Sequence, residues 1–343
     1  MALISIVMVA YNAAVLLPKA LRQISVQTFD DFEFVFVDNG STDDTAKLFL
    51  EFCESFPHIH TQFSRIEVND GLPNGRNRGL SMAGGNYVMF HDADDWMDED
   101  CLEALGKVIE THKPQRIIQQ VRFLDDTETE LDQLTYPENA SRWSKNSLQG
   151  DLFQRQIIED NHLSFAKDAY YDDFYFTNLF NSVSQNAFFL HETHYNMLMH
   201  VHSMTHRYGA RPGYFAPRLE KTFQAMRGIA EKLSTRDSVL YEYNCIQRYY
   251  SDVFRGAGMS LKQKIHEYSV FKKIMEKYYP NYLANKNVKL RAPNGFEGHF
   301  KRNIWLCIRA EKVDRILHAP VIMDFILTVY HVAIKTGVYR YVG

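Results

Sequence analysis

Predominantly apolar runs alternate with helical patterns along the first hundred residues of the chain. Residues 4–10 and 32–37 are apolar runs of strand length, and each is followed by polar residues. Residues 15–26, between them, carry apolar side chains at helical spacing, and residues 42–45 supply a capped start for a second helix. This β-α-β-α order predicts an α/β fold with a mostly parallel central sheet.

Polar residues stand at the ends of the predicted strands. Tyr11 and Asp38 follow the first two strands, and Asp92-Ala93-Asp94-Asp95 follows an apolar stretch over residues 87–90. Parallel α/β sheets bind their ligands at the carboxyl ends of the strands. We therefore expect these residues to meet in one crevice.

The three carboxylates between Asp92 and Asp95 have two interpretations. Carboxylates this close repel one another unless a cation neutralises them, and their hard oxygens suit Mg²⁺ or Mn²⁺. The same residues fit an exposed acidic turn before a helix over residues 98–110, where Asp and Glu favour the helix dipole. Taken alone, the cluster leaves both interpretations open.

After about residue 210 the pattern becomes helical. Four segments with apolar residues at three and four spacing are separated by Gly or Pro breaks, and they are residues 219–233, 238–254, 261–279 and 300–317. We therefore expect one domain over residues 1–215 and an α-helical C-terminal region over residues 216–343.

The end of this C-terminal region is basic. From Asn285 onward ten Lys and Arg stand against four Asp and Glu, so this part carries +6 and, with a total of −4, the preceding residues carry −10. Residues 316–334 are almost apolar, but Pro320 and Asp324 make them a poor membrane span. An interfacial helix near anionic lipid fits this segment, and so does a helix packed on the main domain or on a second subunit.

Composition agrees with a globular protein from a reducing compartment. The 343 residues, of which 45% are hydrophobic, can bury one sizeable core plus an appended subdomain. Four scattered cysteines show no paired spacing, which fits the cytoplasm. The first strand begins at Ile4, so we expect no signal peptide. We expect no nucleic-acid partner.

Four segments, in order, resemble motifs of the family 2 glycosyltransferases, which have the GT-A fold. They are Val9–Asn12 (VAYN), Val37–Thr45 (VDNGSTDDT), Asn69–Leu80 (NDGLPNGRNRGL) and His91–Trp96 (HDADDW). The sequence departs from the family pattern at Ala10, where Pro is commoner, at Gly75, where Ala is expected, and at His91, where an apolar residue is usual. Each motif alone is weak, but four in order favour this family.

The resemblance implies a Rossmann-like GT-A domain that binds a nucleoside diphosphate-sugar. Tyr11 offers a ring for stacking on a base, and Asp38 can accept the imide N–H of uracil, so we expect UDP. The expected donor-binding residues are Ala10, Tyr11, Asp38, Asn39, Gly40, Asn69, Arg76, Asp92, Ala93 and Asp94. Arg76 or Arg78 would screen the diphosphate, although a surface ion pair on a helix fits these two arginines as well.

The same resemblance implies an Mn²⁺ or Mg²⁺ site in a DXD motif. Asp94 would coordinate the metal directly, and Asp92 would hold the ribose hydroxyls or a metal-bound water. In some family members a segment ending in S-x-T carries a His ligand, and Ser203-Met204-Thr205 resembles it. His200 or His202 is therefore the candidate ligand. The five histidines between residues 191 and 206 match no closed zinc pattern.

Transfer of a sugar also needs a base on the acceptor side. Residues 168–176 resemble the family's ED-x-x-F motif, with Asp172 in place of Glu, which makes Asp173 the expected catalytic base and Asp168 the alternative. Adjacent carboxylates among aromatic residues can raise one pKa. A solvated helix N-terminus is the structural alternative.

Together these features predict an inverting, metal-dependent glycosyltransferase. It would move a sugar from a UDP-sugar to a saccharide or lipid-linked saccharide during synthesis of a bacterial capsule, O-antigen or lipooligosaccharide. The donor half would lie at residues 1–105 and the acceptor half at residues 106–215. We expect a cytoplasmic protein at the inner face of the cytoplasmic membrane, whose C-terminal helices contact the membrane or a second copy.

Two other functions fit parts of the sequence. A catalytically silent carbohydrate-binding or assembly subunit would not need every expected carboxylate. A nucleotidyltransferase would usually have a Gly-rich, Lys-containing loop after the first strand, and residues 11–14 lack it.

Overall fold

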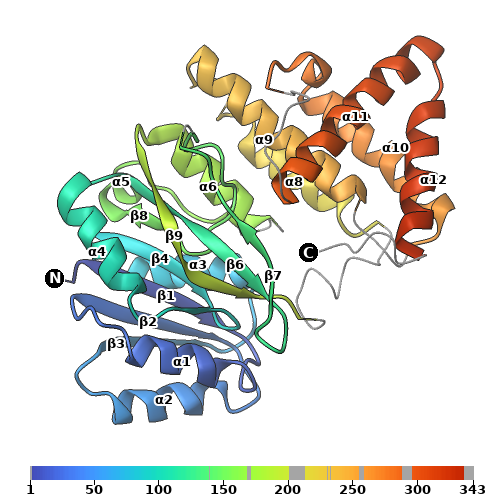
Figure 1. Ribbon diagram of the computed structural model, residues 1–343. Coiled ribbons are helices and arrows are strands. Elements are labelled where there is room, and N and C mark those ends of the chain that lie inside the picture. Colours follow the sequence, from blue (N-terminus) through green and yellow to red (C-terminus); the bar gives the residue numbers. More distant parts are fainter. Residues whose placement is uncertain are drawn as a thin grey trace. The chain divides into compact units, whose positions relative to one another are not determined.

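The chain folds into two compact units, Met1–Leu198 and Met199–Gly343. The structure, a computed structural model shown in Figure 1, describes residues 2–138, 140–167, 171–200, 213–229, 231, 233–254, 259–287 and 296–335. The first unit ends at Leu198, earlier in the chain than residue 215, where the sequence predicts the end of the first domain. The division of that domain into donor and acceptor halves stays a prediction.

The first unit is built on one sheet that mixes parallel and antiparallel pairs. Its strands are β1 (Ile4–Ala10), β2 (Phe32–Asn39), β3 (His60–Ile66), β4 (Tyr87–Asp92), β5 (Trp96–Met97), β6 (Arg116–Leu124), β7 (Glu130–Leu134), β8 (Leu152–Gln154) and β9 (Ala187–Leu198). They follow the order β3-β2-β1-β4-β8-β6-β9-β5, with β7 paired to β6. Strands β1 to β4 run parallel, while β8 is antiparallel to both β4 and β6. The predicted strands and the α/β class are confirmed.

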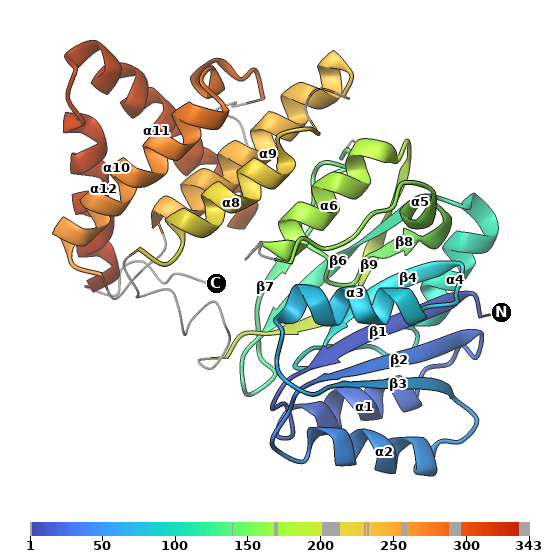
Figure 2. The ribbon, with the colours of Figure 1, turned by 180° about the vertical axis from the view of Figure 1, so that it is seen from behind.

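Helices cover both faces of this sheet (Figures 1 and 2). They are α1 (Leu17–Ser25), α2 (Thr45–Ser55), α3 (Leu72–Met82), α4 (Cys101–His112), α5 (Arg155–Asp160) and α6 (Asp172–Val183). Because side chains alternate along a strand, Ile4, Ile6 and Met8 of β1 join a core with α1, α2 and α4. Val7 points to the opposite face and joins a second core with α5 and α6. Burial on both faces explains why β1 is apolar over almost all of its length.

Two glycines let α3 lie directly against β1. A Cβ atom at Gly79 would come within 2.3 Å of Cγ1 of Val7, and one at Gly75 within 2.5 Å of Cγ1 of Val9. Only residues without a side chain allow this approach. Arg76, which follows Gly75, is thereby brought to the carboxyl end of the sheet.

A buried charge cluster holds the loop between β7 and β8. Arg116 of β6 is fully buried, and its Nη2 lies 2.5 Å from Oδ2 of Asp151. The Nζ atom of Lys145 lies 2.6 Å from Oδ1 of the same carboxylate and also donates to the carbonyl oxygens of Gln119 and Gln149. Burial lowers the pKa of Lys145, while Asp151 opposes this effect. The cluster fixes the segment that carries Gln149.

The second unit is helical, as the sequence predicts. Its elements are α8 (Ala216–Met226), α9 (Thr235–Phe254), α10 (Leu261–Tyr278), the 3₁₀ helix η2 (Tyr282–Ala284), α11 (Phe296–Leu317) and α12 (Val321–Lys335). The apolar segment predicted over residues 316–334 is divided between two helices, because Pro320 cannot continue α11 and His318 adopts a positive φ of 53°. Among the described residues, no helix has both the length and the apolar character needed to span a membrane.

Candidate functional site

Three neighbouring strands end at the same edge of the sheet. β1 lies between β2 and β4, with Ala10 paired to Asp38 and Val9 paired to Asp92. The structure therefore brings Ala10, Asp38 and Asp92 to adjacent strand ends. Since all three strands are parallel, this edge is where an α/β fold binds a ligand.

Hydrogen bonds join the loop after β1 to the loop after β2. The backbone N–H of Asn12 donates to Oγ of Ser41 (3.0 Å), and Oδ1 of Asn12 accepts from the backbone N–H of Thr42 (2.8 Å). Asn12 adopts a positive φ of 48°, which Asn tolerates better than most residues. The turn leaves Tyr11 50% exposed, so its ring is accessible beside the strand ends.

Asp38 is fully buried at the end of β2. Its Oδ1 accepts a hydrogen bond from the backbone N–H of Ser41 (2.9 Å), and its Oδ2 lies 3.5 Å from Nε of Arg65. Within the described residues, Oδ2 has no hydrogen-bond partner. Arg65 thus balances the charge of this carboxylate without a hydrogen bond to Oδ2, so a ligand N–H at this position would be stabilised.

The loop after β2 also contacts the segment before α3. Gly40 has a φ of +79°, and a Cβ atom there would lie 2.6 Å from the backbone nitrogen of Asn69. Nδ2 of Asn39 donates to Oδ1 of Asn69 (3.3 Å). Asn39, Gly40 and Asn69, all predicted donor-binding residues, therefore lie together.

Asp92 is held from two sides. Its Oδ1 accepts from Nη2 of Arg76 (2.7 Å), and its Oδ2 accepts from Nε2 of Gln149 (3.1 Å). Both carboxylate oxygens of Asp95 are also occupied, by the Tyr195 hydroxyl (2.9 Å) and the backbone N–H of Leu198 (3.0 Å). Burial raises the pKa of Asp95 well above its ordinary value, and the neighbouring Asp94 adds to this effect.

Asp94 and Ala93 lie between these two fixed carboxylates. Asp94 is half-buried and Ala93 is buried. The acidic cluster is therefore a turn in which hydrogen bonds hold Asp92 and Asp95, and it differs from an exposed acidic surface.

His91 is buried at the position where the family usually has an apolar residue. Its Nδ1 lies 2.8 Å from the carbonyl oxygen of Asp92, which can only accept, so Nδ1 carries the proton. Burial lowers the pKa of His91. The ring is therefore neutral at pH 7 and packs 5.3 Å, between centroids, from the ring of Tyr195.

Arg76 joins the end of β4 to the start of α6. Only 4% of its surface is exposed, and its Nη1 lies 2.6 Å from Oδ2 of Asp172 while its Nη2 contacts Asp92. Burial disfavours its charge, but Asp172 and Asp92 together raise the pKa of Arg76. The alternative candidate, Arg78, is exposed and donates to Oγ of Ser64 (3.0 Å).

Asp172 and Asp173 form the first turn of α6. Burial raises the pKa of Asp172 to about 6, against the opposing effect of Arg76 and with a further rise from Asp173. Asp173 is half-buried, and its Oδ1 accepts from the backbone N–H of Phe174 (2.7 Å). Asp172 is thus engaged by Arg76, which leaves Asp173 as the more exposed carboxylate of the pair. Asp168 lies outside the described residues.

The predicted histidine ligands remain predictions. His200 is buried two residues beyond the end of β9, and His202 and the segment 203–205 lie outside the described residues. In the part of the chain that the structure describes, no three His, Cys, Asp or Glu residues form a group that could hold a metal ion.

Sequence reasoning missed two residues that position the acidic cluster, Gln149 and Tyr195. Gln149 lies in a segment without regular periodicity, and its contact with Asp92 spans 57 residues of sequence. Tyr195 lies on β9, where the alternation of a long strand could have identified it as inward-facing.

Comparisons with known proteins agree with this geometry. A model of the family described as Glycosyl transferase family 2 matches residues 5–184. Putative glycosyltransferase EpsH of Bacillus subtilis is 22% identical over 268 residues, which cover 73% of this chain and 72% of that protein. Glycosyltransferase GlyA of Streptococcus pneumoniae is 39% identical over 107 residues, which cover 31% of this chain and only 15% of that protein.

Solved structures share the fold. S. aureus TarS (residues 1–349) in complex with UDP matches with a TM-score of 0.65 and 18% identity, over 99% of this chain and 93% of that one. Mannosyltransferase PcManGT from Pyrobaculum calidifontis, in complex with GDP-Man and Mn²⁺, matches with a TM-score of 0.52 and 15% identity, over 97% of this chain and 86% of that one. The predicted GT-A fold with a helical C-terminal region is confirmed.

Replacing Asp172 with Asn should change how stability depends on pH. An unfolded Asp has a pKa of about 3.9. With a folded-state pKa of about 6, the folded protein retains a proton that the unfolded chain has released. This stabilisation is fully present below about pH 4 and is lost as the pH rises through about 6. From about pH 5 to 7.5 we expect the unmodified protein to lose about 1 kcal/mol of unfolding free energy relative to Asp172→Asn, as measured by urea denaturation.

The exposed Asp126 provides a matched control. Asp126→Asn should follow the unmodified protein at every pH. Parallel curves for the unmodified protein and Asp172→Asn would contradict the raised pKa.

Proposed function

This chain belongs to glycosyltransferase family 2, and we propose that it is an inverting, metal-dependent enzyme that transfers a sugar from a UDP-sugar to a saccharide or lipid-linked saccharide. We propose further that it acts in the cytoplasm, at the inner face of the cytoplasmic membrane. The product would be part of a bacterial surface glycan such as a capsule, O-antigen or lipooligosaccharide.

The observation that carries the choice of uridine is the buried Oδ2 of Asp38, which makes no hydrogen bond within the described residues and has only the Arg65 guanidinium at ion-pair distance. The imide N–H of uracil is a donor that neutral cytosine lacks, and the accessible ring of Tyr11 lies on the next strand end. The match to TarS, which has been solved with UDP and with UDP-GlcNAc, supports the same base. PcManGT, solved with GDP-Man, shares the fold at a lower TM-score and makes guanosine the alternative to exclude.

The carboxylates of the acidic cluster fit Mn²⁺ or Mg²⁺, which hard oxygen donors prefer. We assign direct coordination to Asp94, the second carboxylate of the DXD motif, while Asp92 and Asp95, which each accept two hydrogen bonds from protein donors, hold the turn in place. Asp92 would hold the ribose hydroxyls or a metal-bound water, with His200 or His202 as a further ligand. When bound, the cation would neutralise charge on the departing diphosphate.

Asp173 is proposed as the base because α6 is tied to the donor side of the site. The ion pair between Arg76 and Asp172 holds the first turn of α6 near the end of β4. The carboxylate of Asp173 would take the proton of the acceptor hydroxyl while that oxygen attacks the anomeric carbon. The bond from this carbon to the diphosphate oxygen breaks, and UDP leaves from the opposite side. A single displacement inverts the configuration.

Asp38→Ala should weaken UDP binding by about 1 to 3 kcal/mol, because a buried hydrogen bond to the base is lost. Isothermal titration calorimetry with UDP would measure the change. Asp44→Ala removes the same charge from an exposed position in the same loop and should leave the affinity unchanged. Equal affinity of the unmodified protein for UDP, CDP and GDP would show that Asp38 does not select uracil.

Asp94→Ala should remove both turnover and the Mn²⁺-dependent part of UDP affinity, because the direct ligand is lost. UDP release from UDP-glucose, UDP-galactose and their N-acetyl forms would be measured with Mn²⁺ and with excess EDTA. Asp126→Ala is the exposed control and should behave like the unmodified protein. Undiminished UDP release in EDTA would rule out the metal assignment.

Asp173→Asn should lower kcat by about a hundredfold to ten-thousandfold and leave UDP-sugar affinity nearly unchanged, because a base acts only in the transition state. The amide keeps the shape of the side chain and removes its ability to take a proton. Asp172→Asn should cost less activity. If Asp173→Asn abolishes UDP binding, or if kcat stays within a few-fold while Asp168→Asn is inactive, the roles of these carboxylates are wrongly assigned.

A further inference from the structure

Exposed apolar side chains gather on the last two helices of the second unit. Nine of the sixteen large hydrophobic side chains that are exposed in the described part of the chain lie between Leu306 and Val332. Soluble monomers usually scatter such residues singly, so this concentration marks a surface that another body covers.

One face of α12 is apolar along its length. Its exposed members are Val321, Ile322, Phe325, Val329 and Val332. At about 100° per residue these five positions fall within roughly one quarter of the helix circumference. Met323 and Leu327, on the other side of the helix, are fully buried. The helix therefore has a buried apolar side and, separately, an exposed apolar side.

The apolar face continues around the turn into α11. Ile316 is 77% exposed and Leu317 is 52% exposed at the end of that helix, and Phe325 is 67% exposed one turn into α12. We call Ile316, Leu317, Val321, Ile322 and Phe325 the α11–α12 tip. Figure 1 shows the two helices, in the deepest red tones, meeting at one corner of the second unit.

A buried carboxylate holds the tip in place. Oδ1 of Asp314 accepts from the backbone N–H of Ile322 (2.7 Å), and Oδ2 accepts from that of Met323 (2.9 Å). A side chain of α11 thus satisfies the free N–H groups at the start of α12. Because the turn is fixed by these bonds, exposure of the tip is a property of the folded unit.

The exposed charged side chains beside the tip are basic, and the acidic side chains between residues 306 and 333 are buried or half-buried. Arg309, Lys312 and Arg315 are exposed on α11. Glu311 and Asp314 are buried, and the only other acid between residues 306 and 333, Asp324, is half-buried. Arg315 also lies 3.4 Å from Glu276 of α10.

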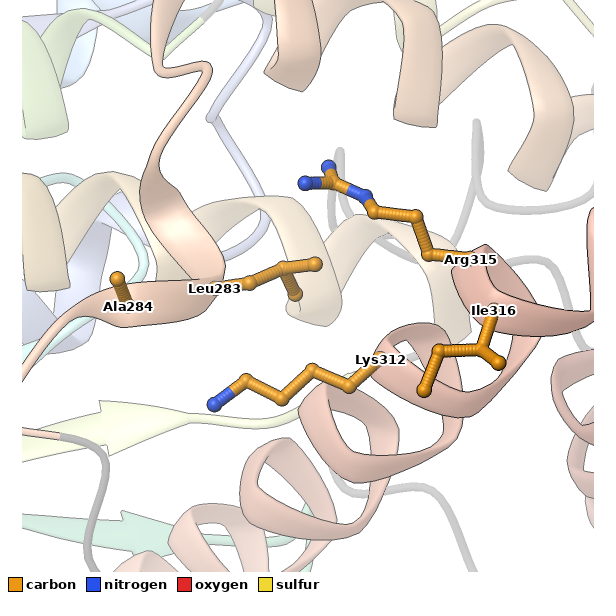
Figure 3. Close-up of a pocket in the computed structure, with 5 residues that line it drawn as sticks. All are labelled: Leu283, Ala284, Lys312, Arg315 and Ile316. Carbon is orange, nitrogen blue, oxygen red and sulfur yellow. The ribbon is translucent and has the colours of Figure 1, made fainter.

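Lys312 and Arg315 line an open depression of about 320 Å³ together with Leu283, Ala284 and Ile316. In Figure 3 both cationic side chains extend from α11 toward Leu283, with Ile316 beside them. Two cations next to apolar side chains match the border between lipid headgroups and acyl chains.

We propose that the α11–α12 tip docks on an anionic phospholipid bilayer. The apolar side chains of the tip enter the boundary between headgroups and acyl chains, and Arg309, Lys312 and Arg315 lie at the level of the lipid phosphates. This docking deepens, and rests on, the proposed location at the inner face of the cytoplasmic membrane, whereas vesicle binding is measured without sugar transfer and can fail or succeed independently of it.

Charge favours a bilayer over a second copy of the chain. A two-fold symmetric contact through the tip would place the arginines and lysine of one copy near those of the other. The acids between residues 306 and 333 are buried or half-buried, and the nearby Glu276 of α10 already lies at ion-pair distance from Arg315 of its own chain. An anionic membrane supplies the opposite charge and the apolar layer together.

Sedimentation with vesicles tests the proposal on the full chain. Vesicles of phosphatidylglycerol mixed with phosphatidylcholine should bind the protein, and pure phosphatidylcholine should bind it far less. Ile316→Ser/Phe325→Ser should weaken binding to the anionic vesicles at least about tenfold, because two apolar side chains no longer insert. Lys312→Gln should weaken it by about fivefold, and high salt should reduce it further.

Matched controls come from α2, where Leu50 and Lys47 are exposed on another helix. Leu50→Ser and Lys47→Gln should bind vesicles like the unmodified protein. Circular dichroism and thermal unfolding would show that the exposed substitutions leave the fold intact. In Phe325→Trp, brominated lipids should quench tryptophan emission beyond the level of the unmodified protein.

Two results would overturn the proposal. In the first, Phe325→Trp shows no added quenching, and the protein binds neutral and anionic vesicles equally or binds neither. The other is a concentration-dependent dimer in analytical ultracentrifugation that Ile316→Ser/Phe325→Ser abolishes while vesicle binding stays unchanged. The second result would assign the tip to a second copy of the chain.

Discussion

The candidate site depends on the burial of one guanidinium group, that of Arg76. A cation with 4% exposure is stable only among carboxylates, because an unpaired charge in the interior is strongly unfavourable. Its two partners, Asp92 and Asp172, come from the end of β4 and the first turn of α6. Because both carboxylates contact the same guanidinium group, the end of β4 and the start of α6 are fixed relative to each other. The glycine contact of α3 with β1 places Arg76 where both carboxylates can reach it.

A second buried charge group supports the same strand end from the other side. Arg116 and Lys145 share the carboxylate of Asp151, and Lys145 also donates to the carbonyl oxygen of Gln149. The side chain of Gln149 then donates to Asp92. Asp92 is thus oriented by a charged and a neutral donor, each tied to a buried ion pair. Such support orients a polar side chain before any ligand arrives, which reduces the reorganisation that binding requires.

The sequence predicts those parts of the structure that depend on local pattern. Strands buried on both faces are continuously apolar, and their polar ends identify Asp38 and Asp92 without knowledge of the fold. The burial of Arg76 was not predictable from its helix alone, because it follows from Gly75 and Gly79 facing β1. Gln149 reaches Asp92 through a loop without periodicity. Its position is set by ion pairs between residues far apart in sequence, which no local pattern records.

The ion pair between Arg76 and Asp172 also constrains recombination between relatives. In a chimera joined near residue 105, the arginine comes from one parent and the carboxylate from the other. In this chain an Asp stands where the family motif has Glu, and its oxygen lies 2.6 Å from the guanidinium. A Glu from the second parent is longer by one methylene group, so helix α6 or the arginine would have to shift to recover this contact. The two positions therefore form a compatibility pair, to be exchanged together when modules of such proteins are combined.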